Sequence, residues 1–197
     1  MLKTRVTEQY GLKVPFINAG MAFVATTPLV RSVCKAGGWG MLGATAMPPD
    51  VLQAALREIK AADPACFGVN FIARFSGIEH IEVCVTEKAP VVVFFWDDPP
   101  DEWLSRLRAA GSHIWFQVGS VGEAKAAVGR GAEALVVQGS ELAATTAPPL
   151  RHSHCSRQSS MLSLPCPSSL QEALPMAGPL LLRWRSAPTR SGWGLAS

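Results

Sequence analysis

The stretch Phe67-Gly68-Val69-Asn70-Phe71-Ile72 is a short apolar run that a single amide side chain interrupts. Polar and apolar residues do not alternate in it, and such unbroken runs are typical of strands covered on both faces. Before it, residues 49–62 begin at the pair Pro48-Pro49 and carry apolar residues at helical spacing. This stretch therefore indicates a buried parallel strand that follows a helix in an α/β fold.

The same alternation of apolar run and helical pattern extends outward in both directions. Six such units in a row predict a parallel sheet with right-handed crossovers, and both a doubly wound sheet and a barrel fit this rhythm. A complete eight-unit barrel needs about 250 residues, whereas this chain has 197. The expected strands are 14–17, 39–42, 67–71, 91–95, 114–118 and 135–137, and the expected helices are 28–36, 49–62, 77–88, 100–110 and 121–130.

Composition and charge limit the function classes. The chain is 48% hydrophobic and 17% charged, with a mean hydropathy of +0.19, so it can bury a sizeable core. We expect no signal peptide, no membrane span and a cytoplasmic location. The five cysteines lack metal-ligand spacing and are expected to be reduced thiols, so no metal site is predicted.

The character of the chain changes after Glu141. Residues 1–141 carry 13 Lys+Arg and 14 Asp+Glu, whereas residues 142–197 carry five arginines and one acid. The arginines of the second part are scattered without interleaved aromatic residues, so we expect no nucleic-acid partner. Strand periodicity and capped helices are absent from it, which is typical of a disordered, low-complexity tail. We therefore divide the chain into a domain with the strand–helix rhythm, 1–141, and an aberrant tail, 142–197.

Uncharged groups recur where the expected strands end. Asn70, Gln117 and Gln138 come at or just after apolar runs, and active sites of barrels lie at the carboxyl ends of strands. Amide side chains both donate and accept hydrogen bonds, so three of them favour recognition of a neutral heteroaromatic ring. The small-residue loop at Gly20-Met21 would allow close approach of backbone to a flat ligand. An ordinary turn at Gly20 and a loop-capping role for Asn70 remain alternatives.

Other polar residues are weaker candidates. Asp97-Asp98 could form a metal or acid/base pair, but Pro99-Pro100 follow, which favours a solvated loop. For His80 and His113, a surface or loop role is favoured over catalysis, and the same holds for His152 and His154 in the tail.

Taken together, five segments resemble the nitronate monooxygenase (2-nitropropane dioxygenase-like) family. This resemblance implies an incomplete TIM (β/α)₈ barrel that binds FMN at the carboxyl ends of its strands and oxidises alkyl nitronates or nitroalkanes with O₂. It implies that Gly20 and Met21 line the flavin through their backbone, and that Asn70, Gln117 and Gln138 hydrogen-bond its polar atoms. The segments are 15–22, 36–44, 68–70, 117–124 and 138–141.

The chain departs from the family pattern after Gln138-Gly139-Ser140-Glu141. In the family this motif continues with Ala-Gly-Gly-His, whose histidine works beside the flavin, but here Thr145 stands at that position. If one base is missing near codon 142, the printed residues 142–147 permit Ala-Gly-Gly-His-His-Arg. Two later stretches, 170–179 and 185–196, permit glycine-bearing segments in the same register. We therefore interpret 142–197 as an out-of-frame translation.

This interpretation predicts a truncated, inactive chain with no catalytic residue, which binds FMN weakly or not at all. One alternative function is that of a flavin-dependent enoyl-acyl carrier reductase, which shares this barrel. An alternative of another class is a non-enzymatic barrel fragment whose open sheet edge pairs with another chain.

Overall fold

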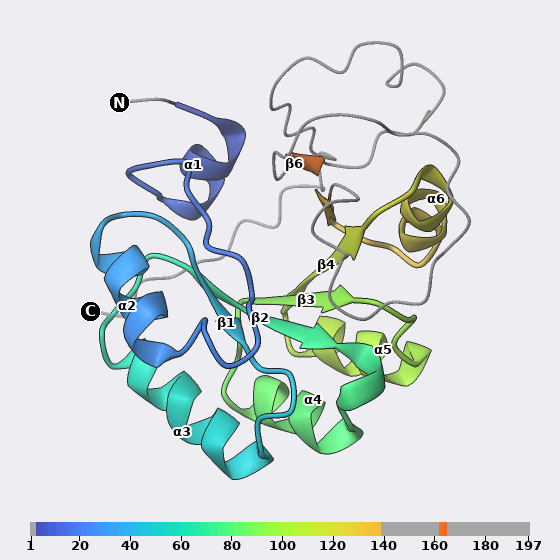
Figure 1. Ribbon diagram of the computed structural model, residues 1–197, viewed down its shortest axis with the longest axis horizontal. Coiled ribbons are helices and arrows are strands. Elements are labelled where there is room, and N and C mark those ends of the chain that lie inside the picture. Colours follow the sequence, from blue (N-terminus) through green and yellow to red (C-terminus); the bar gives the residue numbers. More distant parts are fainter. Residues whose placement is uncertain (1–2, 139–161, 165–197) are drawn as a thin grey trace.

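The computed structural model describes residues 3–138 and 162–164, which form an α/β fold with five parallel strands and six α-helices (Figure 1). Strands β1 to β5 lie side by side in chain order, and each pairs in parallel with the next. This order is the one that successive right-handed βα units produce. The strands are β1 Gly40–Gly43, β2 Phe67–Ile72, β3 Val91–Phe95, β4 His113–Val118, β5 Ala134–Val137 and β6 Leu162–Leu164.

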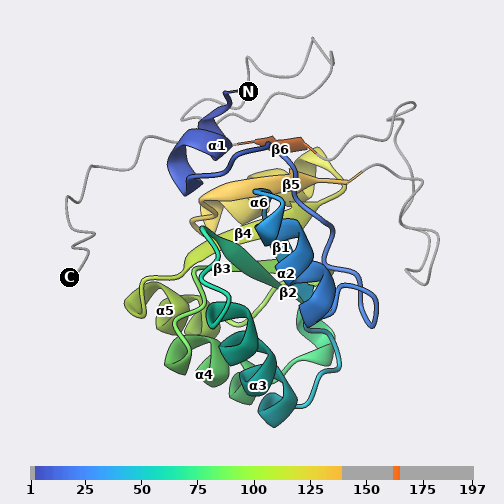
Figure 2. The same ribbon diagram turned by 90° about the vertical axis from the view of Figure 1, so that its left-hand side faces the viewer.

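Helices α2 to α6 cover one face of the sheet, and α3 to α6 connect successive strands, whereas α1 lies on the opposite face. Helices α2, α3, α4 and α5 pack in chain order, each against the next, and α6 packs on β4 (Figures 1 and 2). None of the helices in the described ranges is long and apolar enough to cross a membrane. The helices are α1 Arg5–Tyr10, α2 Thr27–Lys35, α3 Pro49–Lys60, the 3-10 helix η1 Ala73–Phe75, α4 Ile78–Thr86, α5 Asp101–Ala109 and α6 Val121–Gly129.

The helix ends follow from local sequence. Ser120 caps α6 by accepting a hydrogen bond from the backbone N–H of Glu123 at 3.2 Å. Gly111 and Gly131 follow α5 and α6 with φ angles of +85° and +80°, a left-handed conformation that glycine adopts without steric cost. The five predicted helices are confirmed, with ends shifted by at most two residues.

The two faces of the sheet carry two separate hydrophobic clusters. Side chains alternate along each strand, so one set, including Val69, Phe71 and Phe94, packs against the helices. The other set, including Trp39, Val93 and Trp115, lies on the opposite face with Val6 and Tyr10 of α1. We call this second face the inner face, because it corresponds to the inside of a closed barrel. Burying one such side chain contributes about 1.5–3 kcal/mol.

The first predicted strand, 14–17, is not formed as a strand. Only Ile17 pairs, in an isolated parallel bridge with Trp39. Pro15 has no backbone N–H, and the N–H groups of Lys13 and Val14 are drawn to the carbonyl oxygen of Gly37. On the helix side of this segment, an open apolar groove is lined by Val14, Phe16, Ser32, Val33, Ala36 and Gly38.

Three described elements were not predicted from the sequence: α1, the short 3-10 helix η1 and β6. Helix α1 begins at a capping box between Thr4 and Thr7 and ends at Gly11, which has a φ angle of +65°. Strand β6 lies within 142–197, where the sequence indicates no strand, and it pairs antiparallel with β5. A closed (β/α)₈ barrel has parallel strands only, so β6 occupies an edge that the next parallel strand of a barrel would take.

Candidate functional site

The carboxyl ends of the parallel strands bring the predicted amides to one edge of the sheet. In the sheet, Asn70 of β2 lies between its neighbours Gly43 of β1 and Val93 of β3. Gln117 of β4 lies beside Val136 of β5, two residues before Gln138. Side chains alternate between the two faces along a strand, and the three amides fall in the same alternate positions as the inner-face residues Val93 and Trp115. The three amides therefore lie on the inner face. We call the edge formed by Gly43, Asn70, Phe95, Gln117 and Gln138 the mouth.

Gly20 lies directly against Asn70. A methyl group built on Gly20 would be 2.2 Å from the Cβ atom of Asn70 and 2.8 Å from its Oδ1 atom, so only glycine fits there. Asn70 as a whole is 4% exposed, its amide atoms are not fully enclosed, and its side-chain amide makes no hydrogen bond with any described residue. Buried amides are normally paired, so this amide is available to a ligand at the mouth.

Met21 follows Gly20 and crosses the end of β1. Its carbonyl oxygen accepts a hydrogen bond from the N–H of Ala25 at 2.8 Å, and a methyl group on Gly43 would lie 2.2 Å from that oxygen. The Met21 side chain is 41% exposed. The loop predicted to approach a flat ligand is therefore packed tightly on β1 and β2.

Asn18 fixes this loop, although the sequence did not single it out. Its Nδ2 donates to the carbonyl oxygens of Ala19 (2.9 Å) and Met41 (2.8 Å), and its Oδ1 accepts from the N–H of Met41 at 2.9 Å. Asn18 is 7% exposed, so these bonds are shielded from water. Its position one residue past an apolar run is the same signal that identified Asn70.

Gln117 and Gln138 contact each other. Nε2 of Gln117 donates to Oε1 of Gln138 at 2.6 Å, and the backbone N–H of Gln138 donates to the carbonyl oxygen of Val118 at 2.9 Å. The pair leaves the Gln117 carbonyl oxygen and the Gln138 amide nitrogen free to accept and donate further hydrogen bonds. Both side chains are half-buried.

The predicted residues thus form two groups rather than one. Gly20, Met21 and Asn70 lie together at β1 and β2, and the two glutamines lie together at β4 and β5. Strand β3 separates them and places Val93 and Phe95 on the inner face between them. Thr145, which stands at the expected histidine position, lies outside the described residues.

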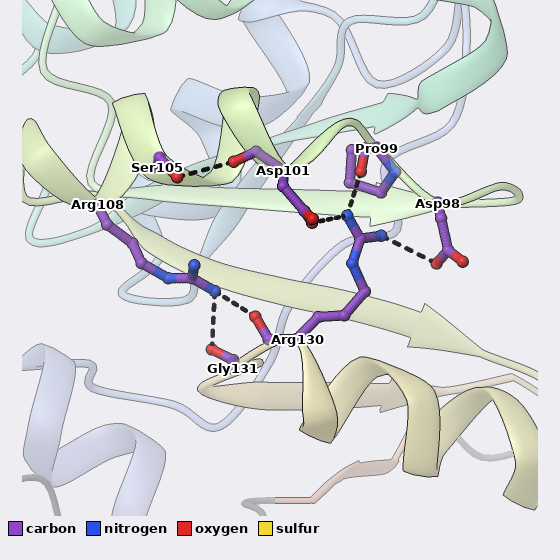
Figure 3. Close-up of polar contacts among 7 residues, drawn as sticks. All are labelled: Asp98, Pro99, Asp101, Ser105, Arg108, Arg130 and Gly131. Atoms are coloured by element: carbon purple, nitrogen blue, oxygen red, sulfur yellow. Dashed lines mark hydrogen bonds and ion pairs between the residues drawn. The ribbon is translucent and has the colours of Figure 1, made fainter.

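Asp97 and Asp98 are held by arginines in the loop after β3. Arg74 of η1 donates to both carboxylate oxygens of Asp97, at 2.6 and 2.9 Å. Its hydrogen bonds lower the pKa of the Asp97 carboxyl below the ordinary range. Arg130 forms an ion pair with Asp98 at 3.1 Å, as Figure 3 shows, and with Asp101 at 2.6 Å. Asp97 and Asp98 lie in an exposed loop, as predicted, and their arginine partners add a structural role that the prediction of a solvated loop did not include.

Arg130 also connects this loop to α6. It donates to the carbonyl oxygen of Pro99, and its guanidinium lies 5.9 Å from the centre of the Phe116 ring. Arg108 of α5 donates in turn to the carbonyl oxygens of Arg130 and Gly131 (Figure 3). The side chains between α5 and α6 therefore have a structural role.

The histidines are structural within the described residues. His80 is buried, not exposed as expected: its Nδ1 accepts from the N–H of Gly77 at 3.0 Å, and its Nε2 lies 3.0 Å from the Met47 carbonyl oxygen. His113 pairs with Glu133 at 2.5 Å, and this hydrogen bond raises the pKa of His113. His113 begins β4, at the end of the sheet opposite the mouth.

Cys34, Cys66 and Cys84 are free thiols, as expected. Burial raises the pKa of Cys66 to about 12, which leaves its thiol protonated and unreactive. In the described part of the chain, no three His, Cys, Asp or Glu side chains lie together in a way that could hold a metal ion.

Comparison with known proteins agrees with this geometry. The family model for nitronate monooxygenase matches residues 3–76 and 73–147. A protein of Mycobacterium tuberculosis, (3aS,4S,5R,7aS)-5-hydroxy-7a-methyl-1-oxo-octahydro-1H-indene-4-carboxyl-CoA dehydrogenase, is 33% identical over 148 residues, which are 75% of this chain and 41% of that protein. A probable nitronate monooxygenase of Staphylococcus aureus is 29% identical over 175 residues, covering 71% of this chain and 49% of that protein.

Solved structures share the fold. FabK from Thermotoga maritima has a TM-score of 0.65 and 34% identity, over 72% of this chain and 45% of that one. Nitroalkane oxidase from Streptomyces ansochromogenes has a TM-score of 0.62 at 24% identity, over 70% of this chain and 49% of that one. The chain thus spans less than half the length of these relatives. Because the family model matches most of the chain, the chain belongs to the nitronate monooxygenase family of flavin-dependent oxidoreductases.

Proposed function

We propose that residues 1–141 carry the ring-binding half of an FMN site in an oxidoreductase that acts on alkyl nitronates. The observation that carries this proposal is the side-chain amide of Asn70, a largely buried residue at the mouth, which makes no hydrogen bond with any described residue. The uncharged polar groups around it suit a neutral ring with several donors and acceptors. Gly20 adds a surface without a side chain, against which a flat group could rest.

Each group has a distinct part in this proposal. Asn70 would bond one polar edge of the ring, and the free oxygen of Gln117 with the free nitrogen of Gln138 would bond another. Their mutual hydrogen bond of 2.6 Å orients both amides before the ligand arrives. Gly20 and Met21 would contact the ring through their backbone, which Asn18 fixes to β1. Each neutral hydrogen bond contributes only about 0.5–1.5 kcal/mol.

When bound, the flavin would take an electron pair from the nitronate and pass it to O₂. The nitronate is suggested by the family match and by the name of the Staphylococcus aureus relative. The chain's own groups at the mouth hold and orient reactants, and no described side chain is placed there to take a proton.

We further propose that residues 142–197 are an out-of-frame translation. The family match ends at residue 147, close to the junction expected after Glu141. The family's histidine and its phosphate-binding loops would then be absent, and Thr145 would stand in place of the histidine. Phosphate groups are usually bound by backbone amides of glycine loops and helix N-termini. This chain would therefore bind FMN weakly and would not catalyse the reaction.

Two other functions compete with this one. The Mycobacterium tuberculosis relative is named as a dehydrogenase of a coenzyme A thioester, which favours an acyl-thioester substrate and keeps a flavin-dependent enoyl-acyl carrier reductase as the second candidate. A non-enzymatic fragment is the candidate of another class. The single bridge at Ile17 and the antiparallel β6 favour it, because both sheet edges depart from a closed barrel.

The test uses a chain whose frame is restored by one base before codon 142. We expect Asn70→Leu and Gln117→Leu each to weaken FMN binding by roughly two- to tenfold, which corresponds to one neutral hydrogen bond. Gln9→Leu on the exposed face of α1 is the matched control and should leave the affinity unchanged. Oxygen uptake with a nitroalkane anion, compared with uptake or reduction with an acyl thioester, separates the two enzymatic candidates. Unchanged affinity in both variants would contradict the assigned ring contacts.

A further inference from the structure

The loops after the strands contain an unusual set of backbone conformations. Of the non-glycine residues with positive φ in the described ranges, Asp63 and Lys88 follow helices α3 and α4, where a left-handed residue is a normal termination. The other four lie in loops that leave the mouth, where no helix end accounts for them. These are Phe23 (φ 62°), Ala46 (59°), Trp96 (45°) and Asp97 (70°).

Trp96 is the least expected member of this set. A positive φ is uncommon in any residue with a Cβ atom, and in a bulky residue it is a true outlier. Trp96 and Asp97 are moreover consecutive, so two strained residues follow the last residue of β3. Strained conformations of this kind persist only where neighbouring contacts hold them, and they gather at ligand-binding sites.

The contacts that hold the turn are present. Both oxygens of Asp97 receive hydrogen bonds from Arg74 at 2.6 and 2.9 Å, which connects the loop after β3 to η1 after β2. On its other side, Asp98 forms the ion pair with Arg130 at 3.1 Å (Figure 3). The turn is therefore fixed from both neighbouring βα units.

The strained turn places an aromatic pair at the mouth. Phe95 ends β3 on the inner face, since Phe94 before it packs against the helices. The rings of Phe95 and Trp96 are 4.6 Å apart and inclined by 33°. Strand β3 runs between β2, which carries Asn70, and β4, which carries Gln117, so this pair lies between the two groups of amides.

Apolar side chains surround the same edge. In the described ranges, most of the exposed large hydrophobic residues lie in the loops after the strands or in the first turns of the helices that follow. Among them, Phe23 is 82% exposed. Apolar side chains around a few convergent polar groups are the composition that small-molecule sites typically have. These rim residues are Met21, Phe23, Val24, Val51, Phe75, Ile78 and Val121.

We infer that Phe95 and Trp96 form an aromatic wall that binds the apolar chain of the substrate, and that the Arg74–Asp97 ion pair positions this wall. The inference rests on the proposed function, because the amides on either side of the wall are the proposed flavin contacts. It assigns to the substrate an alkyl chain of several carbons, which the wall covers. Phe95 and Trp96 then determine specificity, and Arg74 and Asp97 are positioning residues.

The test measures how affinity depends on chain length. Anions of the primary nitroalkanes from nitroethane to 1-nitrohexane are titrated calorimetrically into the protein, with and without saturating FMN. Burial of one methylene strengthens binding by about fourfold, so we expect about this gain per carbon in the wild type. In Trp96→Asn, which tolerates the left-handed backbone but lacks the ring, the gain should fall below about twofold per carbon.

Further variants separate the wall from its support. Phe95→Ala should lower the gain in affinity per carbon as much as Trp96→Asn does, and Asp97→Asn should lower it by less. All three variants should keep the native circular dichroism spectrum. Val14→Asn at the apolar groove and Glu82→Gln, which breaks an ion pair with Arg106 elsewhere, are controls that should leave the gain unchanged. No gain with chain length in the wild type, or an unchanged gain in Trp96→Asn, would overturn the inference. FMN absorbance tests the proposed function separately, in the chain restored by one base: a chain-length gain in affinity that depends on Trp96, together with a restored chain that binds no FMN, would refute only the proposed function.

Discussion

Gly20 and Asn70 show how one small residue determines the geometry of the mouth. The Gly20 backbone packs against the Asn70 side chain, and Asn18 holds the same loop by three hydrogen bonds, two of them to Met41 of β1. Any side chain at position 20 must push Asn70 aside or lift the loop from β2.

We therefore expect Gly20→Ala to destabilise the fold by roughly 1–3 kcal/mol, the usual cost of overpacking a close contact. Gly129 near the end of α6 is the matched control, because a methyl group there meets nothing within 4 Å. Gly129→Ala should be neutral or slightly stabilising, since alanine favours helix. Urea unfolding of both variants provides the measurement, and equal stability of the two would contradict the packing described for Gly20.

At this scale the sequence predicted the polar groups but not their pairing. Asn70, Gln117 and Gln138 were recognisable because each comes at the end of an apolar run. The contact between Gln117 and Gln138 depends on the register of β4 and β5, which no local pattern encodes. Trp96 was missed because its signal is a backbone angle, and a tryptophan in a loop has no sequence signature for it.

Among the elements, β4 and β5 are joined at their first residues by a titratable pair. Glu133, just before β5, hydrogen-bonds His113 at 2.5 Å and also accepts from the N–H of Ile114 at 3.3 Å. The hydrogen bond from Glu133 raises the pKa of His113 in the folded state, against the effect of partial burial.

This shift predicts a pH dependence with a definite sign. A histidine whose pKa is raised on folding contributes stability that is fully present below its unfolded pKa of about 6.5 and is lost as pH rises through the higher folded value. The stability difference between the wild type and Glu133→Gln should therefore be largest below about pH 6.5 and shrink as the pH rises through the raised pKa of folded His113. Glu8→Gln on exposed α1 is the control. A difference that grows with pH in urea titrations would contradict this assignment.

The elements themselves were largely predictable, and the exceptions have physical reasons. Continuous apolar runs and glycine stops located β1 to β5 and α2 to α6. The prediction of a strand at 14–17 was wrong. Pro15 has no backbone N–H to donate, and Ile17 pairs with a neighbouring segment on one side only. Helix α1 is short and polar, so its only sequence signals are the capping threonines and Gly11.

At the scale of the molecule, the described residues form an incomplete barrel, whose inner face is packed near the start of the strands and whose mouth lies at their carboxyl ends. Tyr10, Trp39 and Trp115 close the inner face near the start of the strands, with Tyr10 and Trp39 ring centres 4.3 Å apart. The family match ends at residue 147, so the units that would complete the mouth have no matched counterpart in this chain. The sequence predicted an incomplete barrel, because the alternation of apolar runs and helical patterns stops after six units. It did not predict the antiparallel pairing of β6 with β5.

We propose that this chain keeps the ring-binding side of a flavin site, while a lost reading frame removes the side that binds phosphate. Flavin absorbance tests it most directly, in the purified chain and in a chain restored by one base near codon 142. We expect the restored protein to carry FMN and the present chain to carry little or none after gel filtration. Stoichiometric flavin in the present chain, or a restored chain that remains colourless, would contradict the account.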